Sequence, residues 1–112
     1  MEATEERWYE AELYRLRGDF ALSGSSRDES RADEDYSTAK RIAQQQGSRL
    51  LELRATTSLS RLWYGKGRRA EARDLLAPVY GWFTEGFGTP DLKEAKALLE
   101  ELSQEAVTRH DR

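Results

Sequence analysis

The stretch that decides the fold is SRLLELRATTSLSRLWY, residues Ser48–Tyr64, because it carries two apolar stripes at helical spacing. Spacings of three and four residues place side chains on one side of an α-helix. One stripe holds Leu51, Ala55, Leu59 and Leu62, and the other holds Leu53, Thr56, Ser60 and Trp63. A helix that lies on a globule needs one apolar face, so two faces indicate a helix with neighbours on both sides.

The segment Glu5–Leu22 repeats this pattern, and we expect a helix that is packed from both sides there as well. Its large stripe is Tyr9, Leu13, Leu16 and Phe20, and its opposite stripe is Ala11, Tyr14, Gly18 and Ala21. The small residues of the second stripe would allow a partner helix to approach closely.

Each of these helices is followed by a second helical segment. Ser23–Glu34 (SGSSRDESRADE) predicts a solvated turn. A helix is then expected over Ala32–Gln46, with Gly47 in the left-handed position after its end. Its buried stripe would be Ala32, Tyr36, Ala39 and Ala43.

After the third helix, Gly65 and Gly67 predict a turn, and a fourth helix is expected over Arg69–Phe83. Pro78 lies inside this helix and predicts a kink or a restart, because proline removes one helical hydrogen bond. Its buried set would be Ala72, Leu75, Leu76, Val79, Trp82 and Phe83.

The last helix is expected over 89–107, with Thr89 as its cap and Pro90 in its first turn. One side is apolar and the other is fully polar, which is typical of a helix that caps a stack. The sequence therefore predicts a single all-α domain over 1–112. Its parts are helix hairpins over 1–47 and 48–84, the capping helix over 89–107, and a fraying tail over 108–112.

The spacing of Gly18, Ala32, Tyr36 and Ala39, together with that of Gly67, Ala72, Leu76 and Val79, resembles the tetratricopeptide repeat, a helix–turn–helix unit of about 34 residues. The resemblance implies a right-handed stack in which the first helix of each pair lines a concave groove. The turn after the first helix is longer than in the family, and the proline that usually closes a repeat is absent after the second helix.

Four longer strings carry a second resemblance: WYEAELYRLRGD, SRLLELRATTSLSRLW, GRRAEARDLLAPVYGWFTEGF and TPDLKEAKALLEEL. They are similar to the C-terminal end of large bacterial proteins in which a cyclase-like or regulatory domain precedes a predicted ATPase and a long tetratricopeptide array. The resemblance implies a protein–protein interaction module in a signalling context.

The composition argues against several other functions. The chain has 112 residues, no Cys, one His and a net charge of −3. We therefore expect no enzyme activity, no metal, no cofactor and no nucleic-acid partner, since polyanion binding normally needs a basic excess. The absence of a long apolar run and of a signal sequence favours a cytoplasmic protein without a membrane span.

The concave groove that the resemblance implies supplies the candidate binding residues. They are Glu12, Arg15, Asp19, Arg54, Thr57, Arg61 and Tyr64. Arg54 and Arg61 lie seven residues apart on one side of a helix, and we hypothesise that they grip a carboxylate of a bound peptide. The alternative is surface arginines paired with neighbouring carboxylates.

A different function, a structural module that forms a homodimer, follows from the end of the stack. Trp8 and Tyr9 lie on the first helix, which has no hairpin before it in this sequence. Since repeat arrays usually need about three units or caps, these aromatic residues are candidates for self-association.

Overall fold

The structure is a computed structural model that describes residues 8–25, 27–84 and 88–110, with side chains described from Tyr9 to Ser103. Its described residues form five α-helices: α2 (Trp8–Leu22), α3 (Glu29–Gln46), α4 (Arg49–Gly65), α5 (Arg69–Gly81) and α6 (Pro90–His110). No strand occurs in these ranges, and the predicted all-α class is confirmed. The expected start of the first helix at Glu5 lies outside the described residues.

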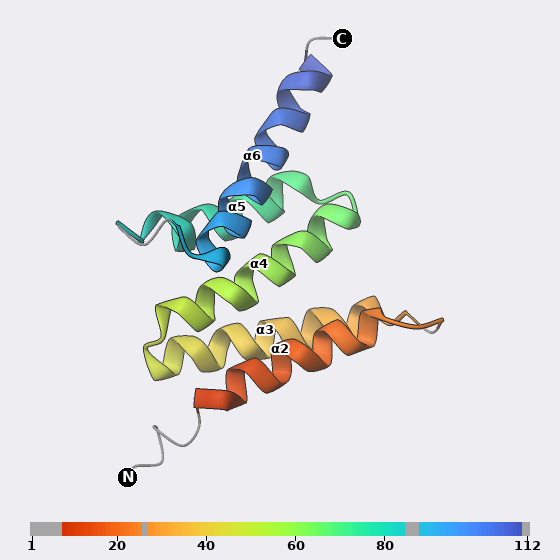
Figure 1. The fold of residues 1–112 in the computed structure, drawn as a ribbon. Helices are drawn as coiled ribbons and strands as arrows, with labels where there is room; N and C mark the ends of the chain where they lie inside the picture. The colour runs from red at the N-terminus through yellow and green to blue at the C-terminus, as the bar shows by residue number, and fades with distance from the viewer. Residues whose placement is uncertain (1–7, 26, 85–87, 111–112) are drawn as a thin grey trace.

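The helices follow one another through space in chain order, from α2 and α3 at one end to α6 at the other (Figure 1). Each helix packs against the next, and α4 also contacts α2 and α6. The radius of gyration is 14.7 Å, whereas about 13 Å is typical of a globule of this length. The body is therefore somewhat elongated, and α4 is the helix that links its two ends.

The second helix begins earlier than the sequence predicted. Asp28 caps α3, and its carboxylate accepts a hydrogen bond of 3.0 Å from the backbone N–H of Arg31. The expected turn over Ser23–Glu34 is therefore wrong in its second half, which is helical from Glu29. The first turn of α3 lacks large apolar residues, so the apolar pattern gave no sign of it, whereas the cap and an acidic first turn suffice to start a helix.

The first hairpin is held by a close contact between Gly18 of α2 and Tyr36 of α3. A β-carbon on Gly18 would lie 2.6 Å from the nearest atom of the Tyr36 ring. Gly47 ends α3 with φ of 74°, as predicted. The small stripe of α2 thus allows the two helices to approach as the sequence suggested.

The third helix is buried on both faces, as expected. Ser48 caps α4 by accepting a hydrogen bond of 3.2 Å from the Leu51 N–H. One face contributes Leu59 and Leu62 to a cluster with Ala32 and Tyr36 of α3. The other contributes Leu53 to a separate cluster. That second cluster unites Leu53 with Ala72, Leu76, Val79, Leu92, Ala95, Leu98 and Leu102.

Helix α2 is not packed from both sides, because its stripe of large apolar residues is exposed. The expectation for this helix is therefore wrong within the described residues. Tyr9, Leu13, Leu16 and Phe20 all rank among the exposed large apolar side chains. The opposite stripe meets α3, and Ala11 and Gly18 are buried there.

The fourth helix does not restart at Pro78, since one α-helix runs from Arg69 to Gly81. Pro78 and Asp74, whose carbonyl loses its helical donor, are both exposed, so water can replace the lost bond. The helix ends before the predicted Phe83. Trp82 is also not buried as expected: it is exposed, and its ring lies against the Arg49 guanidinium at 4.7 Å and the Phe83 ring at 5.3 Å.

The capping helix has the predicted division into two sides. Leu92, Ala95, Leu98 and Leu102 are buried, while Lys93, Glu94, Lys96, Glu100 and Glu101 are exposed. The helix runs to His110, three residues beyond the expected end at Val107, so the tail predicted to fray is helical over Thr108–His110.

Candidate functional site

Six of the seven predicted groove residues lie together. A groove of about 350 Å³ runs between α2, α4 and α6. Its lining consists of Arg15, Asp19, Arg54, Thr57, Ser58, Arg61, Asp91 and Glu94. Glu12 joins this set through its ion pairs with Arg15 and Arg54. The helices that supply the residues are far apart in the chain, and the contacts of α4 with α2 and α6 bring them into one site.

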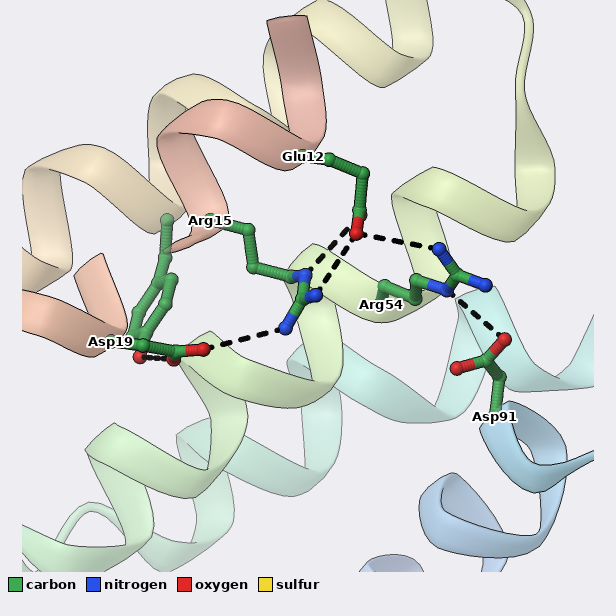
Figure 2. Close-up of polar contacts among 6 residues, drawn as sticks. Glu12, Arg15, Asp19, Arg54 and Asp91 are labelled. Carbon is green, nitrogen blue, oxygen red and sulfur yellow. Dashed lines mark hydrogen bonds and ion pairs between the residues drawn. The ribbon is translucent and has the colours of Figure 1, made fainter. Parts of the chain in front are cut away.

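Arg54 connects the three helices. Its guanidinium lies 3.3 Å from the Glu12 carboxylate of α2 and 3.0 Å from the Asp91 carboxylate of α6. Figure 2 shows the Arg54 side chain between these two acids, with Glu12 also held by Arg15. Arg54 therefore already has two carboxylate partners within the chain, as the alternative interpretation of the arginines described.

Arg15 extends the network along α2. It donates to Glu12 at 2.9 and 3.2 Å and pairs with Asp19 at 3.5 Å. Asp19 in turn accepts a hydrogen bond from the Tyr36 hydroxyl of α3. Burial raises the pKa of the Tyr36 phenol, and the negative Asp19 beside it adds to that rise.

Burial would by itself raise the pKa of the Glu12 carboxyl. The hydrogen bonds and positive charges of Arg15 and Arg54 outweigh this effect and hold the pKa below its usual value. The hydrogen bond to Glu12 likewise raises the pKa of Arg15. Both shifts mean that the charged forms are stabilised by the fold.

Arg61 has a more open environment than Arg54. It pairs with Glu94 at 2.7 Å, and both side chains are about half exposed, at 50% and 52%. It also lies where two hollows meet. The neighbouring hollow, of about 360 Å³, shares Asp19, Ser58 and Arg61 with the groove. A half-exposed ion pair contributes roughly 0–1 kcal/mol, so a ligand can compete with Glu94 for Arg61.

Thr57 and Tyr64 differ in their relation to the groove. Thr57 lines it and is buried, and its hydroxyl has no hydrogen-bond partner among the described residues. Tyr64 instead packs against the core cluster formed by α4, α5 and α6. The structure therefore does not bring Tyr64 to the groove lining.

Asp91 and Glu94 were not among the predicted groove residues. Asp91 lies in the first turn of α6, and Glu94 belongs to the polar side of that helix. They lie three residues apart near the start of α6, which places both on one side of the helix. Nothing in the sequence places that side against α4. With them, three arginines face four carboxylates, so the groove is of mixed charge rather than basic.

A third hollow, of about 700 Å³, lies beside the exposed stripe of α2 and the start of α3. Leu13, Leu16 and Phe20 form its apolar wall, and Arg17 and Asp35 are among its polar residues. Of the two predicted self-association residues, Tyr9 lies on this exposed stripe, whereas the Trp8 side chain lies outside the described residues.

Among the described residues, no group of three or more acids and histidines is placed to hold a metal ion. None of the helices in this part of the chain is long and apolar enough to cross a membrane. Comparison with protein-family models, with curated proteins and with solved structures found no match to the chain.

Proposed function

We propose that this chain is a protein–protein interaction module of the tetratricopeptide type, and that it binds a peptide segment in the groove between α2, α4 and α6. The observation that carries the proposal is the convergence of Arg15, Thr57 and Arg61 with Asp91 and Glu94 on one hollow of about 350 Å³. On the sequence resemblance alone, we extend the proposal to a regulatory role in the bacterial cytoplasm.

The tetratricopeptide part of the proposal is supported by a similarity between the two hairpins. In the first, Gly18 of α2 meets the Tyr36 ring of α3. In the second, the buried Ser60 of α4 donates a hydrogen bond of 2.8 Å to the Ala72 carbonyl of α5. A small residue in the C-terminal half of the first helix thus allows close approach of the second helix in both pairs.

The mixed charge of the groove favours a peptide over a polyanion. Arginine donors suit backbone carbonyls and a terminal carboxylate, while the carboxylates suit backbone N–H groups and basic side chains.

The two arginines of the original hypothesis have different roles in this proposal. Arg54 has two carboxylate partners and serves to hold α2 and α6 against α4. Arg61 has a half-exposed partner at a junction of two hollows. We therefore assign contact with a ligand carboxylate to Arg61.

The test is a selection of random peptides with free C-termini against the full chain, followed by titration of an enriched synthetic peptide. Arg61→Ala should weaken binding by about tenfold or more, since a charged hydrogen bond contributes roughly 1.5–3 kcal/mol. Amidation of the peptide C-terminus should have a similar effect. Arg41→Ala is the matched control, because Arg41 is an exposed arginine of α3 that does not line the groove. A chain that enriches no peptide, or one whose Arg61→Ala variant binds as wild type does, would contradict the proposal.

A further inference from the structure

The hollow beside the groove has a lining of a different kind from that of the groove itself. All the described residues that line the groove are polar. The neighbouring hollow of about 360 Å³, which we call the side hollow, combines polar residues with Leu22, Tyr36 and Leu62. The groove therefore suits the main chain of a ligand, whereas the side hollow suits an apolar side chain.

The apolar part of the side hollow is held in place by the packing of the first hairpin on α4. Tyr36 and Leu62 are buried members of one core cluster, and Leu22 packs against it. The hydroxyl of Tyr36 is fixed by its hydrogen bond to Asp19. Side chains that are ordered before binding lose little entropy when a ligand arrives. The side hollow is thus preorganised.

The charges at the rim of the side hollow are already paired within the chain. Asp19 accepts hydrogen bonds from Arg15 and Tyr36, and Arg27 pairs with Glu29 at 3.1 Å. A charged ligand side chain would meet one rim charge of its own sign as well as one of opposite sign, and it would lose its water. An apolar side chain has no such cost, so it is the better occupant.

The junction of the two hollows holds the groups that recognise a carboxylate. Asp19, Ser58 and Arg61 line both spaces. Ser58 is partly exposed and lies three residues before Arg61, on the same side of α4. A hydroxyl and a guanidinium can both donate to one carboxylate. The chain already places a carboxylate here, because Glu94 pairs with Arg61 at 2.7 Å. A ligand carboxylate would replace that internal partner.

The groove extends from this junction for the length of a short extended peptide. Arg54 lies seven residues before Arg61, which is about 10 Å along α4 at about 1.5 Å per residue. An extended chain advances by about 3.3 Å per residue, so about three residues cover this distance. Figure 2 shows Asp19 and Asp91 at opposite ends of the ion-pair network that follows the groove.

We propose that the side hollow is the specificity pocket for the last side chain of a bound peptide, and that this side chain is large and apolar. The inference rests on the proposed function, since it names the peptide that the groove would bind. The terminal carboxylate lies at Arg61 and Ser58. The final side chain lies between Leu22 and Leu62, and about three preceding residues follow the groove toward Arg54.

A small carboxylic acid with an apolar group shares the chemistry of such a peptide terminus. It would use the junction and the side hollow, but it would leave the polar groove without a ligand. The groove carries arginine donors and carboxylate acceptors, which match the C=O and N–H groups of a main chain. We therefore expect a peptide to bind more tightly than its isolated last residue.

Calorimetric titration of the full chain with a peptide series tests the pocket. The peptides share one sequence from the selection and end in leucine, alanine, aspartate or lysine. The leucine peptide should bind about tenfold or more tightly than the alanine peptide, since each buried CH₂ group strengthens binding roughly fourfold. The charged endings should bind no better than alanine. N-acetyl-leucine should bind at least tenfold more weakly than the leucine peptide, and equal binding of the two would overturn the assignment of the groove to a main chain.

A variant of the pocket wall locates the preference. Leu22→Ala should reduce the preference for leucine over alanine to about threefold or less. Leu50→Ala is the matched control, because Leu50 is an exposed leucine of α4 that lines neither hollow, and it should keep the wild-type preference. Nuclear Overhauser contacts between the methyl groups of the last peptide residue and the Tyr36 ring test the same placement in the wild-type chain. Their absence from a saturated complex would overturn the proposal.

The outcomes separate this inference from the proposed function. Equal binding of all four peptides, with a loss of affinity in Arg61→Ala, would overturn the side hollow as the specificity pocket and leave the groove as a peptide site. Failure of every peptide to bind would overturn both. A leucine preference that depends on Leu22 and on Arg61 would support both.

Discussion

Substitution of Gly18 by alanine tests the packing that holds the first hairpin together. The added β-carbon would lie 2.6, 2.8 and 3.0 Å from three atoms of the Tyr36 ring. Tyr36 is buried, and its hydroxyl donates to Asp19. Its ring therefore cannot move away without the loss of packing, of a hydrogen bond, or of both.

The magnitude follows from opposing effects. Overpacking of a core typically costs about 1–3 kcal/mol, and loss of a hydrogen bond to a charged group adds roughly 1.5–3 kcal/mol where it occurs. Alanine in place of glycine inside a helix returns about 0.5–1 kcal/mol. We expect Gly18→Ala to lower the free energy of unfolding by about 1–3 kcal/mol, which corresponds to a Tm lower by about 4 °C for each kcal/mol.

The assay is urea and thermal unfolding, followed by circular dichroism, at a protein concentration where wild type and variant have the same oligomeric state. Gly65→Ala is the matched control, since Gly65 is the last residue of α4 and a β-carbon there meets no other atom within 4 Å. This control should be as stable as wild type or slightly more stable. A Gly18→Ala protein that equals or exceeds wild type in stability would refute the packing argument.

A double-mutant cycle locates the effect at the Tyr36 ring. The second hairpin has Leu76 where the first has Tyr36, and Leu76 is fully buried in the core cluster that includes Leu53 of α4. Leucine at position 36 would give an added methyl group room. Gly18→Ala should therefore be clearly less destabilising in a Tyr36→Leu background, with a coupling of about 1 kcal/mol or more. Purely additive effects would place the strain elsewhere.

Two further predictions concern the ion pairs of Glu12 and the proline inside α5. The folded state lowers the pKa of Glu12, so the stability that this carboxylate contributes is fully present above its unfolded pKa and is lost as pH falls through the lowered folded pKa. The free energy of unfolding should therefore fall more between pH 5 and acid pH in wild type than in Glu12→Gln. An equal fall in both proteins would contradict the assignment. Pro78→Ala should raise the free energy of unfolding in urea by roughly 1–3 kcal/mol, because it restores a helical hydrogen bond at an exposed position of α5. An unchanged or lower free energy of unfolding would show that the helix already compensates for the proline.

The parts of the fold that the sequence predicted are those in which burial follows a helical period. The two faces of α4, the buried stripe of α3 and the two-sided α6 all repeat apolar or small residues at spacings of three and four. Gly47 was likewise predictable, since a left-handed residue after a helix is most often glycine. In these elements local pattern and tertiary packing agree.

The expectations that failed concern tertiary contacts that a local pattern does not encode. The start of α3 is set by the Asp28 cap, not by apolar residues. Trp82 was expected in the core because it is large and apolar, but α5 ends at Gly81 and leaves the ring exposed against Arg49. The large stripe of α2 has the period of a packed helix, and the described residues supply no neighbour for it.

The groove shows most clearly why a site cannot be completed from one helix. Arg54 and Arg61 lie seven residues apart on one side of α4, and nothing in the sequence distinguishes them. Their partners come from helices about 40 residues away in either direction: Arg54 receives a carboxylate from α2 and another from α6, whereas Arg61 receives one, from Glu94. An arginine between two acids stabilises the assembly of three helices, while one with a single half-exposed partner can exchange that partner for a ligand. The division of roles that we propose for these two arginines therefore arises from the packing of α2 and α6 on α4. A comparison of Arg54 and Arg61 variants measures that packing as much as it measures recognition.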